Sequence, residues 1–232
     1  MRSVARADVS RLSERWLRFI GHTGRRRTVP AVVAACIVGS PGTDVAAQAN
    51  TTTASEWQPP LLRAVRAPES IVLDGRLDEV AWQAAQPVTE FTQNVPDEGA
   101  PASERTEVRI LHDGDALYVG AWLADPQAVS KRVARRDAWL QDSDWFSISL
   151  DTHADRLTAY RFRVNPAGVR GDEVLSGGNA DHGDESWDPV WDAAVAVTDS
   201  GWTVEMRIPF SQLRFDRADA QEWGVQLERT LA

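Results

Sequence analysis

The sequence predicts an all-β protein: a single antiparallel β-sandwich, jelly-roll or immunoglobulin-like, with one or two short helices. Three observations support this prediction. Many short segments alternate apolar and polar side chains with a period of two, turn-forming residues separate these segments, and helical periodicity is scarce. We expect the sandwich to span residues 62–230, which is within the usual size of one domain.

The first 49 residues have the features of a secretion signal. Arg25–Arg27 precede an apolar run from Val29 to Gly39, and Ala47-Gln48-Ala49 is a small-x-small cleavage site. The run is too short to span a bilayer, which needs roughly 20 apolar residues. Val33-Ala34-Ala35-Cys36 also resembles a lipoprotein cleavage box, which would place a lipid on Cys36. Either reading predicts export to the periplasm, the outer membrane or the extracellular space.

Charge divides the leader from the rest of the chain. Residues 1–49 carry eight of the 25 basic residues and three of the 34 acidic residues, so residues 50–232 have a net charge of −14. A chain this acidic repels phosphate backbones, and we expect no nucleic-acid partner. After cleavage at Ala49 no cysteine remains, so the fold must be stabilised without disulfides. Ten Trp against two Tyr favour either a heavily packed core or a sugar-stacking site.

The structural elements are expected to begin after a polar, Pro-rich linker at residues 50–61. Residues 77–86 predict a helix of one or two turns, with Asp78 as its N-cap and Trp82 packed on the core. An Arg-rich second helix is expected at residues 126–136. Hairpins are expected at residues 110–126 and 193–209, and further strands at residues 145–151, 160–164 and 223–229.

Alternation within two of these strands predicts which side chains face the core. In residues 116–124 both faces are apolar, which predicts a central strand covered on both sides. In residues 202–208 the apolar side chains alternate with polar ones. The side chains expected to point inward there are Trp202, Val204, Met206 and Ile208, and the closing strand is expected to bury Trp223.

Three stretches resemble one family. They are "VLDGRLDEVAW" (72–82), "GDALYVGAWLADP" (114–126) and "GWTVEMRIPFSQLRF" (201–215), followed by "WGVQLER" (223–229). This series is similar to the family 9 carbohydrate-binding module, a secreted β-sandwich attached to xylanases and other glycoside hydrolases. It more closely resembles the copy that Gram-negative proteins carry ahead of a C-terminal outer-membrane β-barrel of unknown function. The resemblance covers nearly all of residues 64–229.

The resemblance implies a non-catalytic carbohydrate-binding domain that serves polysaccharide breakdown. We expect the chain to be the N-terminal part of a longer protein that continues into a β-barrel or a hydrolase domain. In the xylanase-attached modules, two aromatic side chains sandwich a terminal sugar and calcium ions brace loops. The alternative is a structural domain in the periplasm or on the cell surface, associated with an outer-membrane β-barrel and without sugar binding.

The candidate ligand-binding residues are tryptophans in polar surroundings. Trp187 and Trp139 lie in charged segments, Trp145 opens a strand after "QDSD", and Asp188 is next to Trp187. We expect a sugar to stack on Trp187 or Trp139, with packing at the rim of the core as the alternative for each. Trp191 begins an apolar alternation and is expected in the core.

Acidic residues in the loops are candidate calcium ligands, since Ca²⁺ takes about 6–8 oxygen ligands. We expect Asp142, Asp144 and Asp151 to hold a structural calcium ion, with a solvated acidic surface as the alternative. The four His are scattered and no nucleophile motif is present, so we expect no catalysis.

Overall fold

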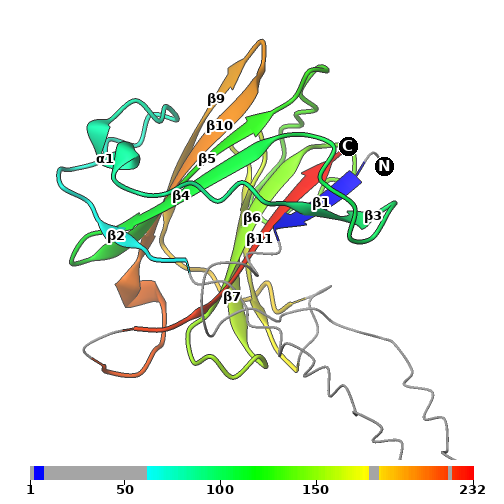
Figure 1. Cartoon of the computed structure of the whole chain (residues 1–232). Coiled ribbons are helices and arrows are strands. Elements are labelled where there is room, and N and C mark those ends of the chain that lie inside the picture. The colour runs from blue at the N-terminus through cyan, green and yellow to red at the C-terminus, as the bar shows by residue number, and fades with distance from the viewer. Residues whose placement is uncertain (1–2, 8–61, 178–182, 219–220) are drawn as a thin grey trace, which may run out of the picture. The chain divides into compact units, whose positions relative to one another are not determined.

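The computed structural model describes residues 3–7, 62–177, 183–218 and 221–232, which fold as two β-sheets (Figure 1). The six-stranded sheet contains, in spatial order, β3 (Thr92–Val95), β1 (Ser3–Ala7), β11 (Gly224–Leu231), β6 (Trp145–Asp151), β7 (Ala159–Val164) and β8 (Arg170–Leu175). The five-stranded sheet contains β2 (Val65–Arg66), β4 (Thr106–His112), β5 (Ala116–Ala124), β10 (Gly201–Pro209) and β9 (Asp192–Thr198). Every pairing is antiparallel except that of β2 with β4. The predicted all-β sandwich is therefore confirmed.

The core lies between the sheets, and the alternation in the sequence supplies it. The inward side chains of β10 are fully buried, as predicted, and they face their register partners on β5, such as Leu123 opposite Trp202. From the other sheet, Phe146, Ile148 and Phe162 complete the same apolar cluster. β5 is central, as its two apolar faces predicted.

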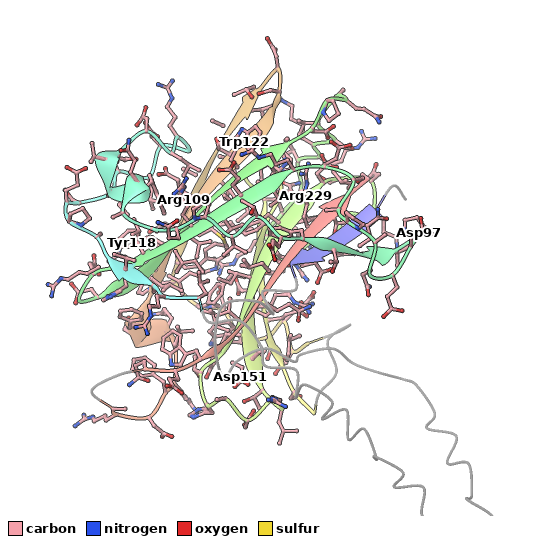
Figure 2. The ribbon with its side chains drawn as sticks, in the orientation of Figure 1. Asp97, Arg109, Tyr118, Trp122, Asp151 and Arg229 are labelled. Carbon is pink, nitrogen blue, oxygen red and sulfur yellow. The ribbon has the colours of Figure 1, made fainter. Side chains whose placement is uncertain are left out.

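The outer face of the five-stranded sheet is covered by residues 67–85. Trp82, which is 2% exposed, packs with Tyr118 of β5, while Trp122 lies toward the other end of β5 and is partly exposed (Figure 2). A Cβ atom at Gly120 would lie 2.8 Å from the Trp82 ring, so only glycine allows this close approach. Trp82 thus holds the covering segment, residues 67–85, against β5, as predicted.

The described residues contain one short α-helix and one 3-10 turn, in agreement with the one or two short helices that the sequence predicts. Helix α1 spans Val80–Gln83 with Glu79, not Asp78, at its N-cap and without a side-chain cap; a 3-10 turn, η1, spans Phe210–Gln212. Residues 126–136 form no helix, because the backbone N–H of Asp144 is bonded to Ser130 O instead. No helix of the described residues has the length and apolar character needed to cross a membrane.

Two further predictions need comment. Trp223 is not in the core of the sandwich: it precedes β11, stays partly exposed and packs on Phe215 with ring centroids 5.2 Å apart. The predicted signal features between Arg25 and Ala49, and the linker at residues 50–61, lie outside the described residues. Residues 3–7 of the predicted leader form β1.

Candidate functional site

A buried network of charged side chains lies on the outer face of the six-stranded sheet. On β7, Tyr160 and Phe162 face the core, so Arg161 and Arg163 point to the other face. Both arginines are nevertheless at most 9% exposed. Glu173 of β8, the register partner of Arg161, accepts a hydrogen bond at 3.0 Å from each guanidinium.

Further hydrogen bonds hold this network in place. Glu173 Oε2 accepts the N–H of Gly183 at 2.7 Å, and Arg161 Nε donates to Ser149 Oγ at 3.3 Å. Arg163 Nη2 donates to Glu185 at 2.8 Å, and the Glu185 side chain is 50% exposed. Buried charges are tolerated only when they are paired in this way. The network therefore fixes two guanidinium groups beside an accessible carboxylate.

Trp139 lies over this network with a large exposed surface. Its ring stacks on Trp145, with centroids 5.2 Å apart and an interplanar angle of 19°, and Arg163 Cζ lies 5.3 Å from its centroid. Trp145 is 2% exposed and donates its indole N–H to Leu140 O, so it is a fixed support. Trp145 and Arg163 project from the same face of neighbouring strands, so both lie beneath Trp139. With 47% of Trp139 exposed, we infer that its opposite face is accessible.

This arrangement has the chemistry of a sugar-binding surface. An exposed indole face can pack on the C–H face of a sugar ring, while guanidinium and carboxylate groups bind hydroxyls. Arg163 Nε is buried and has no hydrogen-bond partner among the described residues. A Cβ atom at Gly171 would lie 2.5 Å from this atom, so glycine is needed to leave Arg163 room.

The structure brings the candidates Trp139 and Trp145 together, but it places Trp187 elsewhere. The Trp187 ring packs at the rim of the core, 4.8 Å from Tyr160 and 5.5 Å from Phe162. This is the packing at the core rim that was the alternative for Trp187, and its role in ligand binding stays a prediction. Trp191 is 1% exposed, which confirms its predicted place in the core.

Asp188 belongs to a second charged cluster. Its carboxylate pairs with Arg136 at 3.2 Å, and Arg136 also donates to the buried Asp172. Asp172 accepts the indole N–H of Trp191 at 2.8 Å as well. Burial raises the pKa of Asp172, and these two hydrogen bonds oppose that effect. This cluster fixes the start of β9 beside β8.

The three predicted calcium ligands have separate partners. Asp142 pairs with Arg132 at 2.8 Å. Asp144 accepts the backbone N–H groups of residues 130 and 232, and Asp151 accepts those of residues 153, 155 and 156. Among the described residues, no three or more His, Cys, Asp or Glu side chains gather where they could hold a metal ion. Calcium binding stays a prediction.

Comparison with known proteins identifies the family. Residues 73–229 match the family model described as carbohydrate family 9 binding domain-like. The chain belongs to this family. The match is to a non-catalytic binding domain, and no other kind of domain is detected. The family matches the one that the sequence motifs resembled; the β-barrel context stays an expectation.

Solved structures similar to the chain include a family 9 carbohydrate-binding module from Caldicellulosiruptor kristjanssonii. In its complex with cellotriose it is 18% identical, with 71% of this chain and 82% of that chain covered and a TM-score of 0.46. In its complex with glucose the identity is 20%, the coverage 72% and 84%, and the TM-score again 0.46. No curated protein sequence matches the chain.

Proposed function

We propose that the protein is an exported, non-catalytic domain that binds a carbohydrate against Trp139 and so serves polysaccharide breakdown. Trp139 carries this proposal: among the aromatic side chains of the described residues, it is the only exposed one. It also lies directly beside Arg163. Arg163 and Glu185 supply hydrogen bonds to the sugar, and Glu173 keeps Arg163 in position.

The charge of the network favours a neutral sugar. Arg161 and Arg163 are balanced by Glu173 and Glu185, so the site has no excess charge that would select an anionic ligand. Stacking of one ring contributes about 1 kcal/mol beyond burial. The remaining affinity comes from hydroxyl groups, for which the fixed guanidinium group lowers the entropic cost of ordering.

Trp139→Ala tests the site. Binding of the full chain is measured by titration calorimetry against a glycan panel that starts with glucose and cellotriose, the ligands of the Caldicellulosiruptor module. We expect Trp139→Ala to weaken binding at least tenfold in a protein that stays folded. Trp122→Ala is the matched control, because that ring is also partly exposed and lies under an arginine, but on the five-stranded sheet. Equal losses in both variants, or none in Trp139→Ala, would contradict the proposed site.

Three further parts of the proposal have their own tests. Cleavage after Ala49 predicts that the exported protein begins at Asn50, which N-terminal sequencing measures. A lipid-modified start at Cys36 would favour the lipoprotein reading.

Failure of the wild-type protein to bind any glycan would favour the alternative of a structural domain beside an outer-membrane β-barrel. A structural calcium ion would raise the melting temperature on calcium addition.

A further inference from the structure

Strand β1 lies inside the six-stranded sheet although it comes from the extreme N-terminus of the chain. It pairs with β11 over all five residues, from Ser3 opposite Leu231 to Ala7 opposite Leu227, and with β3 on its other side (Figure 1). Residues 8–61 separate it in sequence from the next described residue. Cleavage of the predicted leader after Ala49 would remove β1 entirely and leave a gap within the sheet.

The β3 side of this gap is held by contacts that do not involve β1. The N–H groups of Gln93 and Ala102 donate to Ala100 O at 2.7 Å and Phe91 O at 3.0 Å, so β3 pairs with its own return segment. Phe91 is 5% exposed, and Val88 exchanges two backbone hydrogen bonds with Val108 of β4. These contacts tie β3 to the core and to the five-stranded sheet.

The β11 side is held equally well. β11 pairs with β6 from Gly224 to Thr230. Arg229 of β11 is fully buried and donates to Ala124 O at 2.6 Å and Thr106 Oγ1 at 3.1 Å, on the opposite sheet (Figure 2). Because one strand spacing is about 4.8 Å, β3 and β11 lie roughly 10 Å apart and cannot pair directly. Without β1, both would present unpaired backbone groups to the same gap.

We propose that the position between β3 and β11 is a strand-acceptor site, which residues 3–7 occupy reversibly. Its ligand is one extended strand that runs antiparallel to β11, bound by main-chain hydrogen bonds on both edges. An identical free strand can therefore displace residues 3–7, and removal of the leader vacates the site. This proposal does not depend on sugar binding at Trp139.

Disulfide trapping in the full chain tests whether the strand occupies the site and exchanges. Val4 and Thr230 are register partners, so Val4→Cys and Thr230→Cys, with Cys36→Ser, should form a cross-link under mild oxidation. The control pair Val4→Cys and Thr198→Cys, with Thr198 on β9 of the other sheet, should not. A millimolar peptide of residues 1–9 should lower the yield of the cross-link at least twofold. The same peptide with Ala5→Pro should not, because proline removes a ladder donor.

A measurement on the unmodified chain covers the case in which the cysteine variants do not fold. Isotope-labelled peptide 1–9, mixed with the chain, should show amides protected from hydrogen exchange by at least tenfold relative to the free peptide. Absence of the cross-link, a yield that the peptide leaves unchanged, or an unprotected peptide would each overturn the proposal.

Discussion

Replacing Glu205 with Gln tests the buried carboxylate that ties the covering segment to β10. Glu205 is fully buried, and its oxygens accept the N–H groups of Asp74 at 2.9 Å, Gly75 at 2.8 Å and the Trp82 indole at 3.1 Å. Burial raises the pKa of Glu205 from 4.5 to about 7, against the opposing effect of these donors. The folded protein therefore keeps this proton to a higher pH than the unfolded chain does.

Stability falls with rising pH wherever the folded state binds more protons than the unfolded state. For Glu205 this window runs from pH 4.5 to about 7, and at about 1.4 kcal/mol per pH unit it amounts to at most about 3 kcal/mol. Gln does not titrate, so the difference in unfolding free energy between the wild type and Glu205→Gln isolates this contribution. Measured by urea unfolding, the stability of the wild type relative to the variant should decrease across this window.

The sign of the pH dependence decides the test. If the stability of the wild type relative to Glu205→Gln stayed flat between pH 4.5 and 7 and fell only as the pH dropped below 4.5, the reasoning would be refuted. The three N–H donors would then outweigh burial and hold the pKa of Glu205 below its ordinary value. Glu90→Gln is the matched control, since it makes the same substitution at an exposed glutamate.

Three further substitutions test the packing by urea unfolding. Trp202→Ala removes a fully buried ring and should cost about 3–5 kcal/mol; a cost under about 1 kcal/mol would mean that the register of β10 is wrong. Gly120→Ala should cost about 1–3 kcal/mol, because the new Cβ would lie 2.7 Å from Leu77 Cδ2 and 2.8 Å from Trp82; unchanged stability would mean that the covering segment yields easily. Trp187→Ala should cost about 2 kcal/mol through lost packing at the core rim. No cost there would restore the interpretation of this ring as an exposed platform.

The fold could be predicted where one face of a strand is apolar. Both hairpins and β7 show this alternation, and their inward side chains pack in the apolar core between the sheets. β8 was missed because Asp172 and Glu173 lie in its middle, and both are buried only through Arg and Trp partners distant in sequence. β1 was missed because residues 3–7 lie within the predicted leader, and only a long-range pairing with β11 and β3 makes them a strand.

The two loop tryptophans show what local sequence cannot decide. Trp139 and Trp187 both have charged neighbours in the chain, and both were candidates for stacking. Their difference comes from residues far away: Tyr160 and Phe162 receive the ring of Trp187, whereas Trp145 and Arg163 support Trp139 from below. No pattern within either loop carries that information.

The alternation of β7 connects the fold to the site. It places Phe162 in the core and, one residue later, Arg163 on the outer face. On β8, Glu173 pairs with Arg163, and Gly171 leaves room for the Arg163 side chain. Without these two residues the outer face would be a solvated surface. The pairing desolvates the guanidinium, and desolvation strengthens its interactions with any hydroxyl that reaches it. A charged strand face thus becomes a rigid set of hydrogen-bonding groups beside Trp139, and strand register places the residues of the proposed sugar site.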